Sequence, residues 1–354
     1  TTRNLLRHRA SAAIMLGDEV ASASSTGELA AAWAKLPLMA RSLLSEEVDP
    51  RTISAVISSE IRDITRRAAE LAEAKLAANR QGPPPCGFAV LVLGSAGRGE
   101  SLLAADQDNA IVYERGVEGG PEDRWFEALG TEMCHILHEV GIPLCKGGIM
   151  AKNRAWRMSL ADWKTTIDNW VRRQRPEDLL NVDIFYDGVA VHGDILLGEE
   201  IWNYAYARGH RAPDFLKLLT EVARQRSPAF TLFGYIRVDE KGRIDLKKAG
   251  LMPIFTSARV LSIRHDVRTR ATPDRLRGVA ARGIGSEQEI DEIIDAHRVI
   301  LGAMLTQQLA DAEEGAPLSP RVNPDRLGRA GKRQLSKALG KVDAIIDLVS
   351  EGRI

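Results

Sequence analysis

Two aspartates, Asp106 and Asp108, are separated by one residue and precede an apolar run from Ala110 to Tyr113. Side chains at positions i and i+2 of a strand point to the same face, so both carboxylates are expected to project together. Neighbouring carboxylates raise each other's pKa unless a cation neutralises them. Mg²⁺ takes carboxylate oxygens together with substrate phosphates, so the pair predicts a divalent-cation site.

A glycine-rich turn lies just upstream of the aspartates. The apolar run from Phe88 to Leu93 has the length of a buried strand and ends at Gly94. Ser95 is expected to cap a short helix that runs through Leu102 and Leu103. Gly97 and Gly99 are expected to keep the turn free of bulky side chains.

This turn is the predicted phosphate half of the site. Backbone N–H groups at a helix N-terminus attract phosphate, and Arg98 can add a bidentate contact. The segment contains neither a Walker A motif nor the glycine spacing of a Rossmann fingerprint. Turn and aspartates together predict a metal-nucleotide site. A solvated surface loop is the competing interpretation.

The stretch GSAGRGESLLAADQDNAIVY resembles the signature of the polymerase-beta-like nucleotidyltransferase superfamily. More narrowly, it resembles bacterial nucleotidyltransferases related to PII-uridylyltransferase and glutamine-synthetase adenylyltransferase. Those proteins carry GSxGRxE followed by TDQDNA, and Ala105 stands here where Thr or Ser is common. Further matches extend over nearly the whole chain: the glycine turn after Gly141, Trp156, the segment Phe185–Asp187, Asp245–Lys247 and Thr272–Leu276.

The resemblance implies roles for residues of the motif. Gly94, Ser95, Arg98 and Glu100 are expected to contact the nucleotide. Residues 233–238 and 242–247 are predicted to form a short hairpin that brings Lys247, which matches the family's DLK, toward the triphosphate. For Lys247, an ordinary surface lysine is an equal alternative.

A third carboxylate completes the metal site in this superfamily. Residues 179–187 are predicted to form a strand, and Asp187 matches the family's aspartate there. Asp183 is the alternative, and a structural aspartate at either place is also open.

The implied fold is α+β: a nucleotidyltransferase core with a small mixed sheet, flanked by N-terminal helices and a C-terminal helical bundle. We expect an N-terminal helical region over residues 1–80, a catalytic domain over 81–197 and a helical substrate-binding domain over 198–354. The boundary near residue 81 is the Gln-Gly-Pro-Pro-Pro stretch. The N-terminal helices carry no chemistry and are expected to pack or to mediate a homo-oligomer.

Two periodic features carry alternative interpretations. Trp156, Trp163 and Trp170 recur every seven residues, which favours a core stripe over base stacking. His135 and His138 lie three apart on a predicted helix, which favours surface histidines over a metal pair.

Bulk composition bounds the class of protein. With 44% hydrophobic and 27% charged residues, the chain is typical of a globular protein. Its formal net charge is zero, which argues against nucleic acid as a partner. Three cysteines without metal spacing fit a reducing cytoplasm, and no apolar run is long enough for a membrane span. The first residue, Thr1, is not Met, which suggests processing or a fragment.

We therefore expect a nucleotidyltransferase that moves NMP from an NTP to an acceptor hydroxyl and releases pyrophosphate. Mg²⁺, with Mn²⁺ as an alternative, would be held by Asp106, Asp108 and Asp187. A protein acceptor such as a PII-like signalling protein is the leading candidate. A nucleotide-binding regulatory module without turnover, or a structural helical adaptor, are the alternatives.

Overall fold

The computed structural model describes residues 15–173, 182, 184–225 and 227–351. The contacts between Cα atoms divide the chain into two compact units. The first unit contains the described residues within 1–48, 55–101 and 105–205, and the second those within 49–54, 102–104 and 206–354.

The first unit is built on a four-stranded sheet with the order β3-β2-β1-β4. Its strands are β1 (Phe88–Val92), β2 (Asn109–Tyr113), β3 (Arg157–Ser159) and β4 (Val189–Gly193). The central strand β1 pairs antiparallel with β2 and β4, whereas β2 and β3 are parallel. Every residue of β1 and β2 is buried, as expected for apolar runs in the centre of a sheet.

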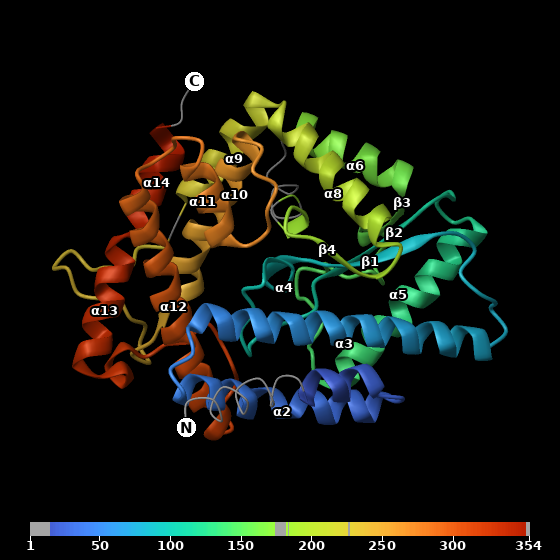
Figure 1. The fold of residues 1–354 in the computed structure, drawn as a ribbon, viewed down its shortest axis with the longest axis horizontal. Helices are drawn as coiled ribbons and strands as arrows, with labels where there is room; N and C mark the ends of the chain where they lie inside the picture. The colour runs from blue at the N-terminus through green and yellow to red at the C-terminus, as the bar shows by residue number, and fades with distance from the viewer. Residues whose placement is uncertain (1–14, 174–181, 183, 226, 352–354) are drawn as a thin grey trace. The chain divides into compact units, whose positions relative to one another are not determined.

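Helices surround this sheet (Figure 1). They are α2 (Thr26–Ser45), α3 (Pro50–Ala78, of which the first residues belong to the second unit), α4 (Gly94–Arg98), α5 (Pro121–Val140), α6 (Leu160–Arg173) and α8 (Ile195–His210), with the 3₁₀ turn η1 (Arg154–Trp156). Figure 1 shows α5 and α6 on opposite sides of β1 and β2. The predicted α+β fold, with a small mixed sheet and helices at both ends of the chain, is confirmed.

Aromatic side chains of these helices pack against the sheet and against one another. Phe126 of α5 stacks on Tyr113, with ring centroids 4.6 Å apart. The three tryptophans of η1 and α6, which are Trp156, Trp163 and Trp170, are all buried and contact one another. The core interpretation of the tryptophan stripe is therefore confirmed.

The helix that contains His135 and His138 also follows the sequence pattern. Both histidines are exposed on α5, and His135 lies 3.4 Å from Glu139 in the next turn. The surface interpretation is confirmed.

The predicted strand over residues 179–187 is wrong where the structure describes it. Residues 184 and 185 are helical, and Tyr186 N–H donates to the Val182 carbonyl, four residues earlier. Tyr186 and Asp187 then form a turn, and the strand of this region is β4. The reason is tertiary packing: Phe185 is buried against Trp163 and Trp170, which the helical turn permits.

The second unit is largely helical (Figure 1). Its helices are α9 (Pro213–Arg224), α10 (Met252–Arg264), α11 (Thr272–Ala280), α12 (Glu287–Glu313), α13 (Gly328–Gly340) and α14 (Val342–Glu351), with a π-helical turn η2 (Lys247–Leu251) and a 3₁₀ turn η3 (Pro324–Leu327). α10 forms the centre of the unit, since every residue from Pro253 to Ile263 is buried.

The sequence predicts a hairpin between residues 233–238 and 242–247 of this unit, and this prediction is wrong. Strand β5 (Ile244–Asp245) pairs instead with β6 (Arg321–Val322), far along the chain. Arg243 explains the choice of partner, because its guanidinium forms two hydrogen bonds with the buried Asp311 of α12. This charge pair holds β5 beside the segment that follows α12.

Among the helices that the structure describes, none combines the length and the apolar character that crossing a membrane requires.

Candidate functional site

The backbone at the start of β2 determines where Asp106 and Asp108 point. Asp108 carbonyl accepts from Leu93 N–H at 2.9 Å, which extends the β1–β2 pairing beyond its last strand residues. On the other side, Gln107 and Asn109 N–H groups donate to the carbonyls of Pro143 and Ile149. The segment is therefore extended, with alternate residues on opposite sides.

The two polar residues of this segment that face inward are buried and hydrogen-bonded. Gln107 Nε2 donates to the carbonyls of Cys134 and Ile142 at 3.1 and 2.9 Å. Asn109 Oδ1 accepts from Ala151 N–H at 2.8 Å. Because these inward positions are occupied by hydrogen-bonded amides, the aspartates that alternate with them take the opposite, solvent-facing side.

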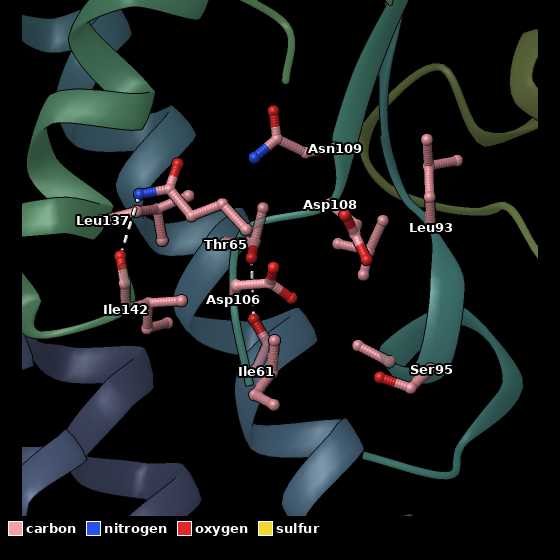
Figure 2. Close-up of a pocket in the computed structure, with 12 residues that line it drawn as sticks. Ile61, Thr65, Leu93, Ser95, Asp106, Asp108, Asn109, Leu137 and Ile142 are labelled. Atoms are coloured by element: carbon pink, nitrogen blue, oxygen red, sulfur yellow. Dashed lines mark hydrogen bonds between the residues drawn. The ribbon is translucent and has the colours of Figure 1, made fainter. Parts of the chain in front are cut away.

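Asp106 and Asp108 share one small pocket, as predicted from their spacing (Figure 2). Figure 2 shows their side chains in the centre of this pocket, with Ser95 of α4 across from them. Asp106 is exposed and Asp108 is half-buried. Apolar side chains also line the pocket, including Ile61 of α3 and Leu137 of α5.

Gly94 makes room for one of these carboxylates. A Cβ atom at Gly94 would lie 2.6 Å from Asp108 Oδ2, and its backbone has a φ of +58°. Only glycine adopts this left-handed conformation readily and leaves the space free. The glycine of the GS turn is therefore required by the close approach of Asp108.

Gly97 has a similar role against a different segment. A Cβ atom there would lie 2.2 Å from the carbonyl oxygen of Asp187. The turn thus packs directly on the segment before β4, which confirms that Gly97 keeps it free of bulk, whereas a Cβ atom at Gly99 would meet no atom within 4 Å.

The helix at this turn differs from the prediction. It is α4, which begins at Gly94 and ends at Arg98, before Leu102 and Leu103. Ser95 is therefore inside the helix, and Leu93 is its N-cap residue. The helix ends early because Gly99 takes a left-handed conformation with a φ of +77°.

Ser95 still faces the pocket, although it is not the cap. Its Oγ lies 2.8 Å from Ser101 Oγ. A hydroxyl in this position can donate to a ligand phosphate, so the predicted nucleotide contact is compatible with the geometry.

Arg98, Glu100 and Asp187 form a buried charge cluster. Arg98 Nε donates to Glu100 Oε2 at 3.0 Å, and Arg98 Nη1 donates to Asp187 Oδ2. Arg98 is 6% exposed and Asp187 is 0% exposed. Burial disfavours the charged guanidinium, but the carboxylates of Asp187 and Glu100 outweigh it and raise the pKa of Arg98 above its ordinary value.

The structure therefore brings the predicted site residues together in two groups. Asp106, Asp108 and Ser95 line the pocket, whereas Arg98, Glu100 and Asp187 contact one another. The roles predicted for the second group, phosphate contact and a third metal ligand, stay predictions.

The two remaining predicted residues are Asp183 and Lys247. Asp183 is outside the described residues. Lys247 is exposed at the first position of η2 in the second unit, and its contact with the triphosphate stays a prediction.

Cys145 is the residue that sequence reasoning missed. Its Sγ and one carboxylate oxygen each of Asp106 and Asp108 all lie within 4.8 Å of one another. Burial and the neighbouring Asp108 carboxylate raise the pKa of this thiol to about 11. Cysteine spacing gave no signal, because the sulfur reaches the aspartates only through the loop after α5. The one sequence feature that pointed to this loop was the glycine turn at 147–148, next to Cys145.

The donor set fits a divalent cation. Two carboxylates converge from one face of an extended segment, and a cation between them would relieve their mutual repulsion. A nucleotide phosphate could share such an ion, because the pocket is open at Asp106.

Fold and site together define a class: a small mixed sheet with a pair of carboxylates at the start of its second strand, opposite a GS turn, is the arrangement expected of a nucleotidyltransferase. Comparison with protein families agrees. Residues 34–177 match the family described as "Putative nucleotidyltransferase DUF294", and residues 213–351 match "Putative nucleotidyltransferase substrate binding domain". The chain belongs to this nucleotidyltransferase family. No curated protein matches the chain.

Proposed function

We propose that the chain transfers a nucleoside monophosphate from an NTP to a hydroxyl group in a metal-dependent reaction. The observation that carries this proposal is the shared pocket of Asp106 and Asp108, opposite the GS turn of a nucleotidyltransferase domain. A divalent ion held by the two carboxylates would neutralise the charge of the triphosphate during transfer.

In the reaction, the acceptor oxygen forms a bond to the α-phosphorus while the bond to the pyrophosphate leaving group breaks. Ser95, which lines the pocket, would donate to a phosphate oxygen. Arg98 and Asp187, assigned to phosphate and metal by resemblance, would first have to separate from each other, since their side chains form an ion pair. Asp187 is then our candidate for receiving the hydroxyl proton.

We further propose that the acceptor is a side-chain hydroxyl of a protein, with a PII-like signalling protein as the leading candidate. A formal net charge of zero gives no general attraction for nucleic acid. The family's substrate-binding region spans residues 213–351, which is more surface than a small metabolite needs. The free state of all three cysteines fits our proposal of a cytoplasmic location.

The test is incubation of the purified chain with each NTP, Mg²⁺ or Mn²⁺ and either purified PII-like protein or a cell extract. We expect a protein whose intact mass increases by one nucleotide, together with release of pyrophosphate. Nucleotide transfer to a small metabolite alone would contradict the protein acceptor and keep the transferase. No transfer to any acceptor would contradict both.

The alternative is a nucleotide-binding regulatory module without turnover, and one observation favours it. Two residues assigned to catalysis by resemblance, Arg98 and Asp187, are buried and paired with each other. Tight NTP binding by calorimetry with no pyrophosphate release would support this alternative.

A further inference from the structure

The second unit contains a cavity of about 850 Å³ that is lined by residues of α9, α10 and α14, three helices that contact one another (Figure 1). Every residue that lines it belongs to this unit, and none of them lines the pocket of Asp106 and Asp108. Sites for small molecules are typically about 300–1,000 Å³ in volume. The cavity is therefore large enough for an organic metabolite, whereas an inorganic ion would fill little of it.

Arg264, the last residue of α10, is a half-buried cation in the wall of this cavity. Its Nη1 donates to the Val349 carbonyl of α14 at 3.0 Å, and its Nη2 donates to Thr220 Oγ1 of α9 at 2.7 Å. Both acceptors are uncharged, and no carboxylate of the described residues forms an ion pair with Arg264. A guanidinium has more donors than these two bonds use, so N–H groups remain for a ligand.

Two other arginines show the arrangement that a buried charge normally has. Arg98 is paired with Asp187, and Arg243 with Asp311, and these carboxylates raise the pKa of each guanidinium. The pairing offsets the cost of removing a charge from water. The pKa of Arg264 is instead lowered by burial. The anionic partner that Arg264 lacks would therefore come from a ligand.

His265 is a second polar group of the wall without a partner. Its Nε2 is buried and has no hydrogen-bond partner within the described part of the chain. Burial and the positive charges of Arg264, Arg282 and His210 lower the pKa of His265. The ring and the Arg264 guanidinium thus line one wall in positive surroundings, which suits an anionic group.

The rest of the lining combines exposed charges with apolar side chains. The charged residues are of both signs and come from α9: Asp214, Lys217, Glu221 and Arg224. Because their formal charges cancel, the positive character of the wall depends on Arg264 and its neighbours. Leu216 and Val349 are buried apolar residues of the same wall, so they offer a dry surface beside the cation.

We propose that this cavity binds a small organic anion, with a carboxylate or phosphate group at Arg264 and His265 and an apolar body against Leu216 and Val349. A planar guanidinium binds either group through parallel N–H donors. The inference does not rest on the proposed function, because it requires neither the metal nor nucleotide transfer.

The test uses the full chain without nucleotide or metal, and probes that share one alkyl chain: octanoate, octyl phosphate, octanol and octylammonium. Calorimetry below their micelle-forming concentrations is performed on the wild type, on Arg264→Met and on Arg298→Met. Methionine removes the charge and keeps an apolar stem. Arg298 is the matched control, because it is also a half-buried arginine of the second unit but lies outside the cavity and is paired with Asp295.

We expect at least one of the two anions to bind the wild type more tightly than octanol and octylammonium by about 10-fold or more, the effect of one hydrogen bond to a charged group. Arg264→Met should lose this preference, and Arg298→Met should keep it. The anion that binds more tightly identifies the head group, carboxylate or phosphate, that the site prefers.

Octanol or octylammonium binding as tightly as the anions would overturn the proposal, as would an unchanged preference in folded Arg264→Met or no binding of either anion by the wild type. If circular dichroism shows that Arg264→Met does not fold, hydrogen exchange of the wild type decides. The bound anion must then slow exchange in peptides that cover α9 and the end of α10, and slower exchange only elsewhere would overturn the proposal.

Discussion

Replacing Gly94 by alanine tests whether the GS turn exists to admit the Asp108 carboxylate. The new Cβ would lie 2.6 Å from Asp108 Oδ2, and ordinary contact begins at 3.4 Å, so the carboxylate must move by roughly 0.8 Å. The oxygen is the end of a rotatable side chain, so this shift costs little folding energy but displaces a metal ligand. A misplacement of about 1 Å at a catalytic group can cost about 100-fold in rate.

The same substitution also has a cost that is unrelated to the ligand. The φ of Gly94 is +58°, and a left-handed conformation costs a residue with a side chain about 1–2 kcal/mol. Gly99→Ala is the matched control, because Gly99 has a φ of +77° and its added Cβ would meet no atom within 4 Å. Both variants should therefore lose similar stability.

The assay combines urea denaturation with calorimetry for Mn²⁺ and with pyrophosphate release. We expect both variants to unfold at lower urea, but only Gly94→Ala to bind the ion at least about 10-fold more weakly and to lose transfer. Equal metal affinity in the two variants would refute the reasoning, because the displaced Asp108 carboxylate would then not be a ligand.

Three further predictions follow from the same geometry. Asp106→Asn and Asp108→Asn should each abolish metal-dependent transfer with an unchanged circular dichroism spectrum, and wild-type rates in both would end the metal assignment. Arg98→Ala should lower the free energy of unfolding by about 3–5 kcal/mol, because it removes a guanidinium between buried carboxylates, whereas Arg115→Ala, in an exposed ion pair, should change it little. Glu60 is buried, and desolvation raises its pKa from 4.5 to about 7. As pH rises, Glu60 ionises in the unfolded state before it ionises in the folded state. The contribution of Glu60 to the free energy of unfolding therefore falls between pH 4.5 and about 7. Glu60→Gln should flatten this part of the profile of urea midpoint against pH, and an unchanged slope would contradict the assignment.

Much of the site was predictable because its key residues are close in sequence. The i, i+2 spacing of Asp106 and Asp108 determines a shared face wherever the segment is extended, and the structure agrees. The helical region predicted before residue 81 likewise contains α2 and α3, and α2 continues through Pro37.

Contacts between distant segments were not predictable in the same way. The placement of Cys145 depends on a loop that local patterns do not specify. Residues 184–187 looked like a strand, but burial of Phe185 among tryptophans decided otherwise. Arg98 was assigned to phosphate from its place in the motif, while its contact with Asp187 joins segments 89 residues apart.

The amides of Gln107 and Asn109 have a consequence for moving this site into another protein. A strand that slips by one residue exchanges its two faces, which would bury both aspartates and expose both amides. The hydrogen bonds from Gln107 to the carbonyls of Cys134, within α5, and Ile142, just after it, oppose such a slip, as does the bond from Ala151 to Asn109. A graft of the two aspartates alone would therefore leave their register undefined. The transferable unit is the segment Asp106–Asn109 together with residues 134–142, whose Cys134 and Ile142 carbonyls accept from Gln107.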